Sequence, residues 1–131
     1  MFADDEFTLE LGRAVLSAAE LSAVMVALLA STGRAMADLK DVSLGALVTS
    51  LDRSPLADCP GFDLFHTAAK CAVKSRNALT HALPEGRHRL VRTGSTARET
   101  VVFDTVASVR VVTAQLDVAR MYADVLLKRV A

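Results

Sequence analysis

Apolar residues recur at intervals of three and four along two long segments of the chain. The first pattern predicts one helix over residues 7–30, and the last predicts a helix from about Thr105 onwards, despite many β-branched residues. The predicted apolar faces comprise Leu11, Val15, Ala18, Leu21, Met25 and Leu28 in the first segment, and Val109, Val112, Leu116, Ala119, Ala123, Leu126 and Val130 in the last. The second half of the first helix is apolar on all sides, so it is either central to a bundle or shared with a second subunit.

Two further helices are predicted between these segments. Gly33 ends the first helix, and Ser43 caps a short helix with leucine and valine on one side. After a loop marked by two prolines, Asp63 caps a third helix that runs to about Leu83, where a proline and a glycine stop it. One face of this third helix carries Phe65, Ala69, Ala72, Arg76, Leu79 and Leu83.

A small sheet is predicted just before the last helix. Residues 88–93 and 100–103 are rich in β-forming side chains, and the polar, glycine-containing segment 94–99 between them is typical of a hairpin loop. The fold class is therefore all-α, a bundle of four helices, or five, with a β-hairpin before the last one. The length of 131 residues fits a single domain spanning 1–131.

The amino-acid composition disfavours several classes of protein. Apolar residues make up 52% of the chain and charged residues 23%, which disfavours disorder, and the scarcity of aromatic residues disfavours a base-stacking RNA-binding sheet. The two cysteines are too few for a disulfide framework, and no spacing typical of metal ligands occurs, so a reduced, cytoplasmic protein without metal or cofactor is expected. The apolar run Leu21–Ala30 is half the length of a membrane span, so no membrane partner is expected.

Basic residues gather in the middle of a chain whose formal net charge is zero. Between positions 70 and 98 the only acid is Glu85. The basic residues of this segment are Lys70, Lys74, Arg76, Arg87, Arg89, Arg92 and Arg98. This segment either holds an anionic ligand or forms a solvated face.

The stretch Ser75–His81, SRNALTH, is the one candidate for chemistry. Asn77 and His81 are four residues apart, so they share a helix face, where the amide can hydrogen-bond an imidazole nitrogen. Arg76 and His81 are five apart, about 140° around a helix, so one helix cannot aim both at the same atom. Two such helices that meet across a two-fold axis can build one cleft from both chains.

A purely structural interpretation of Arg76 stands beside this one. Arg76 is the only charge on the apolar face of its helix, and Glu20 is the only charge in the apolar part of the first helix. A buried Arg76–Glu20 ion pair would satisfy both groups, and His81 would then be an incidental surface histidine. His66, on the same helix, is expected to be a packed bundle histidine.

The Arg-Asn pair followed by three residues and a histidine resembles the motif of the HEPN superfamily, which is Arg, four to six residues, then His. The resemblance covers the motif closely, and the rest of the chain only in helix order and length. It implies a small helical bundle that forms a homodimer and cleaves RNA without metal, in a toxin–antitoxin, phage-defence or RNA-processing setting, with an antitoxin protein as a partner in the first case. Other HEPN domains are inactive, so the alternative is a module that binds a nucleotide, RNA or a protein.

The resemblance assigns roles that fit the chemistry of RNA cleavage. Such cleavage needs a base for the ribose 2′-hydroxyl and a cation for the charged phosphorane. His81 supplies the proton transfer, Arg76 binds the phosphate oxygens, and Asn77 orients His81 or binds phosphate. Lys74 and Thr80 would add phosphate contacts, while Arg89 and Arg92 on the hairpin either follow the RNA backbone or serve solubility. The expected products are a 2′,3′-cyclic phosphate and a 5′-hydroxyl.

Overall fold

A computed structural model describes residues 5–85, 89–94 and 100–130 of the chain. This part contains four α-helices, which are α1 (Asp5–Ser31), α2 (Leu44–Asp52), α3 (Phe62–Thr80) and α4 (Val106–Val130). Its remaining elements are the 3₁₀ turns η1 (Met36–Leu39) and η2 (Pro55–Asp58) and the strands β1 (Leu83–Pro84), β2 (Leu90–Arg92) and β3 (Val101–Phe103). The prediction of an all-α bundle with a small sheet before the last helix is confirmed.

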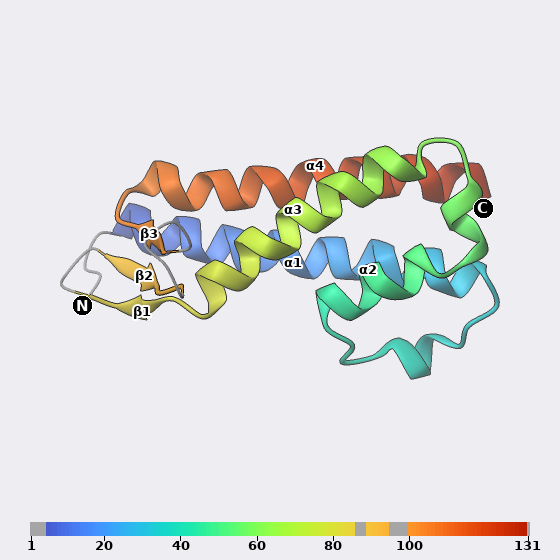
Figure 1. Ribbon diagram of the computed structural model, residues 1–131, viewed down its shortest axis with the longest axis horizontal. Coiled ribbons are helices and arrows are strands. Elements are labelled where there is room, and N and C mark those ends of the chain that lie inside the picture. Colours follow the sequence, from blue (N-terminus) through green and yellow to red (C-terminus); the bar gives the residue numbers. More distant parts are fainter. Residues whose placement is uncertain (1–4, 86–88, 95–99, 131) are drawn as a thin grey trace.

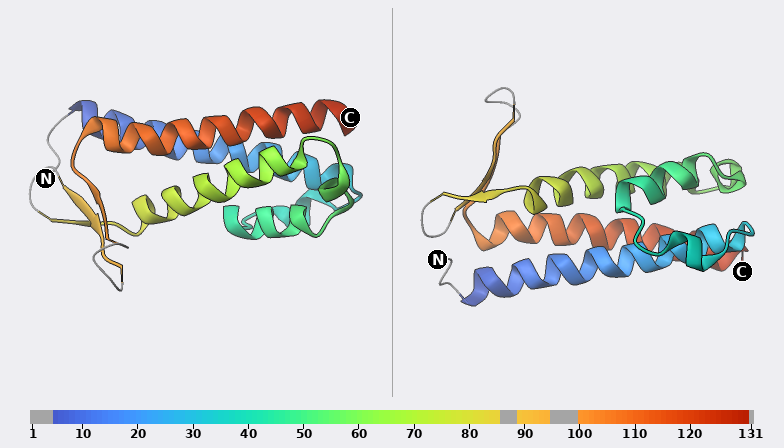
Figure 2. Two further views of the ribbon diagram at one scale, coloured as in Figure 1. Left: turned by 45° about the horizontal axis from the view of Figure 1, so that its top comes forward. Right: turned by 90° about the horizontal axis from the view of Figure 1, so that it is seen from below.

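The two long outer helices, α1 and α4, run side by side in the same direction. Two ion pairs fix their register, Glu10–Arg110 at 3.3 Å and Glu20–Arg120 at 3.1 Å, and both join residues 100 positions apart. Helix α3 runs back along α4, α2 lies along the second half of α1, and the sheet sits at the end where α3 finishes and α4 begins (Figure 1, Figure 2). The end of α3 therefore lies beside the sheet, and an open hollow separates it from the first half of α1.

The core follows the predicted apolar faces with two exceptions, Val15 on α1 and Leu83, which lies beyond the end of α3 and is also 72% exposed. The inner positions of both long helices are buried, among them Leu21, Met25, Leu116 and Leu126. Val15 was predicted to share the core face, which is wrong, since it is 72% exposed. The reason lies in the short length of α2, which covers only the second half of α1 and leaves its first half open on that side (Figure 1).

Both ends of α3 differ from the prediction. Gly61, not Asp63, is the N-cap residue, and its φ of 89° is a left-handed conformation that suits glycine. The helix ends at Thr80, and His81 is the C-cap, with its backbone N–H donating to the Asn77 carbonyl at 3.0 Å. The helix stops before Leu83 because a residue preceding proline favours extended backbone. The predicted cap of α2 is confirmed, since the Ser43 hydroxyl accepts from the Ala46 N–H at 3.2 Å.

The sheet has one strand more than the predicted hairpin. Strands β2 and β3 pair antiparallel as expected, with Val91 opposite Val102. Strand β1 adds to β2 through the pair Leu83–Val91, and its proline is tolerated because β1 is an edge strand. Of the predicted features, Gly86, Arg87, His88 and Arg98 lie outside the described residues.

Helix α1 also meets the length and composition of a membrane span. Over Glu6–Ser31 its most apolar window has a mean hydropathy of 1.9, and 39% of that window is buried inside the protein. The ten-residue run Leu21–Ala30 is therefore only part of the apolar stretch of this helix, whose hydropathy is high over a longer window. A core helix of a bundle has the same properties, and α1 packs on both α4 and α2.

A buried carboxylate links the two long helices near the sheet. Glu10 is 2% exposed, and its Oε1 accepts from Arg13 at 2.6 Å and from the Arg110 Nε and Nη2 at 3.4 and 3.3 Å. Burial raises the pKa of Glu10, but the hydrogen bonds and positive charges of Arg13 and Arg110 outweigh it and hold the pKa below its ordinary value. The ionised form is thus the one that the fold favours.

Acid is expected to weaken the fold through Glu10. A pKa that is lower in the folded than in the unfolded chain contributes stability above the ordinary value of 4.5, and this is lost as pH falls through the lowered folded pKa. Chemical denaturation between pH 7 and pH 3 would measure it, with Glu10→Gln compared with the original chain. We expect Glu10→Gln to be less stable at pH 7 and to show a shallower loss towards acid. Parallel pH profiles for the two proteins would contradict the role of Glu10.

Candidate functional site

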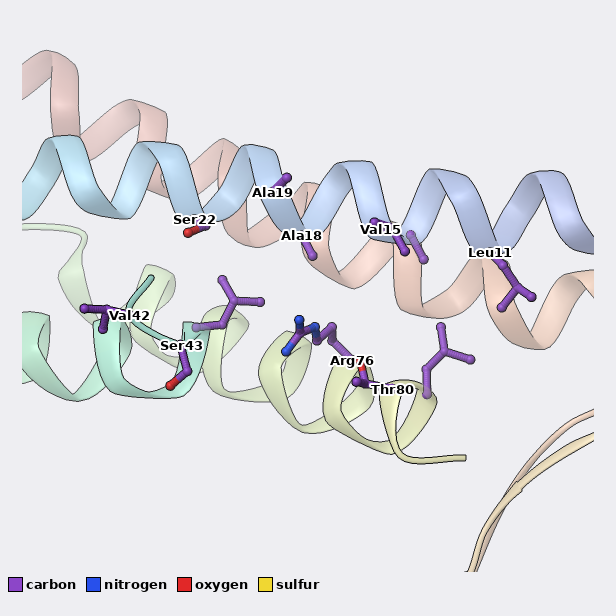
Figure 3. Close-up of a pocket in the computed structure, with 12 residues that line it drawn as sticks. Leu11, Val15, Ala18, Ala19, Ser22, Val42, Ser43, Arg76 and Thr80 are labelled. Atoms are coloured by element: carbon purple, nitrogen blue, oxygen red, sulfur yellow. The ribbon is translucent and has the colours of Figure 1, made fainter. Parts of the chain in front are cut away.

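The SRNALTH motif occupies the last two turns of α3 and its C-cap, and its side chains divide between two sides of the helix. Arg76 and Thr80 lie on the side that faces α1, where they line an open hollow of about 620 Å³. Figure 3 shows the Arg76 side chain reaching from α3 towards α1 across this space. We call it the Arg76 hollow. It is lined by Leu11, Ala14, Val15, Ala18, Ala19, Ser22, Val42, Ser43, Leu44, Arg76, Leu79 and Thr80.

The Arg76 guanidinium has no carboxylate partner among the residues that the structure describes. Its recorded side-chain hydrogen bond is from Nη1 to the Oδ1 of its neighbour Asn77, at 3.4 Å. The alternative of an Arg76–Glu20 pair is wrong, because the Glu20 carboxylate pairs with Arg120 at 3.1 Å. The register of α1 and α4 explains this, since Glu20 lies opposite the residue 100 positions later and therefore faces α4. A half-buried cation is thus left available to an anion from outside.

His81 lines a different hollow, between α3 and the sheet. This His81 hollow, of about 540 Å³, is lined by Lys74, Asn77, Ala78, His81, Arg92, Thr93, Gly94 and Val101. The predicted shared face of Asn77 and His81 is confirmed. The predicted bond between the Asn77 amide and the imidazole is not formed, because the Asn77 Oδ1 turns to Arg76 on the neighbouring side.

The other predicted RNA-binding residues separate in the same way. Lys74 and Arg92 lie in the His81 hollow, and Thr80 lies in the Arg76 hollow. Arg89 lines neither, and its guanidinium lies 3.6 Å from the Glu85 carboxylate. Within one chain, therefore, the Arg76 guanidinium and the His81 imidazole lie on different sides of the end of α3, as their five-residue spacing predicts.

A third hollow, of about 510 Å³ between α2 and α3, was not predicted. It is lined by Gly45, Val48, Thr49, Asp52, His66, Lys70, Val73, Lys74 and Asn77. The prediction that His66 is a packed histidine is confirmed, since its ring stacks on Phe62 at 5.6 Å between ring centroids and its Nε2 lies 3.6 Å from the Asp52 carboxylate. The four-residue steps from His66 to Lys70 and Lys74 are the sequence signal that could have identified this face.

The site is built from protein groups that bind anions and move protons. Within residues 5–85, 89–94 and 100–130, no group of three histidine, cysteine or acidic side chains is placed to hold a metal ion. The guanidinium of Arg76 and the ammonium of Lys74 suit phosphate oxygens, and the exposed imidazole of His81 suits proton transfer. A ligand that uses Arg76 and His81 together must reach two sides of α3, or take one group from each of two chains.

Comparison with known proteins identifies no relative. No family model, curated protein or solved structure gives a significant match to this chain.

Proposed function

We propose that the protein is a dimeric, metal-independent endoribonuclease that resembles HEPN domains and acts in the cytoplasm. The observation that carries this proposal is the Arg76 guanidinium, which stands in an open hollow without a carboxylate partner in the described part of the chain, five residues before an exposed histidine. A half-buried arginine costs free energy unless it is paired or solvated, and in the open hollow this guanidinium is accessible to water and to an anion. The free cysteines Cys59 and Cys71 suit a reducing compartment.

The reaction needs little beyond these groups. His81 removes the proton from the ribose 2′-hydroxyl, whose oxygen then attacks the adjacent phosphorus. Arg76 binds two non-bridging oxygens and stabilises the charge of the phosphorane, and Lys74 adds a second positive charge beside His81. The P–O5′ bond breaks and the 5′-oxygen takes a proton from water, which yields a 2′,3′-cyclic phosphate and a 5′-hydroxyl. His81 then returns its proton to the solvent.

Dimerisation would bring the two groups together. The Arg76 hollow is lined by an apolar side chain that is open to solvent, Val15, which is 72% exposed. In the proposed two-fold contact through this face and the end of α3, Arg76 of each chain lies towards His81 of its partner. The contact occurs twice, because in an isologous interface residue i meets residue j and residue j meets residue i. Each cleft then draws its cation and its base from different chains.

RNA cleavage without metal tests the proposal directly. Purified protein should cut unpaired RNA in the presence of EDTA and leave 2′,3′-cyclic phosphate ends, detected by mass spectrometry. An oligonucleotide with 2′-deoxyribose at the cleaved nucleotide should stay intact, because the attacking hydroxyl is missing. If activity requires a divalent ion, or if the deoxy substrate is cut, the proposed mechanism is wrong.

A second candidate is a non-catalytic module that binds a nucleotide. The Arg76 hollow has the volume of a small-molecule site and combines an apolar lining with one cation. Calorimetry with ATP and GTP would show saturable binding that Arg76→Ala removes, in a protein that leaves RNA uncut.

A further inference from the structure

One face of α3 carries basic and polar side chains along most of its length. His66, Lys70, Lys74, Asn77 and His81 are spaced by four, four, three and four residues, so they fall within about 80° of an ideal helix. They span roughly 22 Å along its axis. This face is separate from the side of α3 that holds Arg76.

Two hollows lie next to each other along this face. Lys74 and Asn77 line both the hollow between α2 and α3 and the His81 hollow. Together the two hollows extend from His66 to His81 and Arg92. We call this pair of hollows the α3 groove.

The charge of the α3 groove is positive and largely uncompensated. Its basic members are Lys70, Lys74 and Arg92, and none of them forms an ion pair with another described residue. The one acid among the described residues that line it, Asp52, lies 3.6 Å from His66. A polyanion is therefore the ligand that this groove suits best.

We propose that the α3 groove binds the backbone of an unpaired RNA strand that extends from the cleavage position at His81. This inference rests on the proposed ribonuclease function and adds a substrate class to it. The groove has room for about four nucleotides, the lower end of site sizes for single-strand binding. Because no phenylalanine, tyrosine or tryptophan is among the described residues that line it, the contacts go to phosphates and not to base faces. Base preference is therefore weak and salt dependence strong.

Binding can be measured apart from cleavage, with labelled deoxyoligonucleotides that lack the reactive hydroxyl. Affinity should rise with length up to about four nucleotides and then level off. Lys70→Ala should weaken binding about fivefold and lower the log–log salt slope by about 0.7, the value for one phosphate contact on a single strand. The matched control is Lys128→Ala, which removes an exposed lysine in the last turn of α4, outside the groove. If Lys70→Ala and Lys128→Ala bind alike, the groove is not the binding site.

Cleavage gives the second measurement, with chimeric substrates that hold one ribonucleotide between deoxy flanks of increasing length. For the original chain kcat/KM should rise with flank length, and in Lys70→Ala this rise should be about fivefold smaller, whereas Lys128→Ala should follow the original chain. If kcat/KM depends neither on flank length nor on Lys70, the proposed RNA site in the α3 groove is wrong, whereas the proposed nuclease activity still stands. If binding depends on Lys70 but the protein does not cleave RNA, the α3 groove is the binding site and the proposed nuclease activity is wrong.

Discussion

Alanine at Arg76 or at His81 is expected to lower the rate of RNA cleavage by about 10²–10⁴-fold. His81→Ala removes the base that accepts the 2′-hydroxyl proton, and Arg76→Ala removes the cation that stabilises the phosphorane. Single-turnover cleavage of a labelled RNA in EDTA would measure both. Equal activity in the original chain and both variants would mean that a contaminating nuclease does the cutting.

A mixture of the two inactive variants separates a shared site from a site within one chain. In a mixed dimer with Arg76 and His81 drawn from different chains, one cleft lacks both groups and the other is complete. Refolding equal amounts together makes half of the dimers mixed, so about one quarter of the original activity should return. If each chain held a whole site, no activity would return, and the shared cleft would be refuted.

The same variants distinguish a functional from a structural Arg76. Because Glu20 pairs with Arg120, Arg76→Ala leaves no buried carboxylate without a partner. The free energy of unfolding should therefore change by no more than about 1 kcal/mol, as for other substitutions that break no buried pair. A loss of about 3–5 kcal/mol would instead indicate that Arg76 supports the bundle.

Lysine at Val15 is expected to dissociate the dimer and abolish cleavage with it. Val15 is 72% exposed in the single chain, so a lysine there is solvated in the monomer and leaves its fold intact. In the proposed interface the same charge would be buried without a partner, which costs several kcal/mol and, at about 1.4 kcal/mol per factor of ten, raises the dimer Kd at least 100-fold. Sedimentation velocity and cleavage at the same protein concentrations would show whether the two losses coincide.

Val111 on α4 offers the matched control, since it is a valine of similar exposure, 56%, on a different helix. Val111→Lys should remain dimeric and active. If Val111→Lys dissociates the dimer and Val15→Lys does not, the chains meet through α4, and the two halves of the proposed cleft lie too far apart to act together.

The sequence predicts the fold well wherever helical periodicity decides it. Leu21, Met25, Leu116 and Leu126 are buried because residues at such spacing on a long helix meet one neighbour along its whole length. Val15 departs from this rule because the neighbour on its side, α2, is short. The spacing of apolar residues within the first helix does not reveal how long the helix that packs against it will be.

One detail of the site depends on tertiary register and could not be predicted from the sequence. Glu20 and Arg76 looked complementary as isolated charges in apolar surroundings, but the direction of α4 beside α1 determines that Glu20 meets Arg120. The division of Arg76 and His81 between two sides of α3, in contrast, follows from five residues at 100° each, and the structure places them so. Helix geometry is local, whereas pairing between helices is not.

The parallel alignment of α1 and α4 also bears on how the chain folds as it is synthesised. The helices that pack most extensively against each other are separated by 100 residues at both ion pairs, so α1 leaves the ribosome long before its main neighbour exists. Until then most of its apolar side is open to water, because α2 is the only earlier α-helix in the described part of the chain that packs closely on it. A helical protein of this size usually folds through local contacts, whereas here the decisive contact is the most distant one. Nascent chains that end before α4 should consequently recruit chaperones or aggregate.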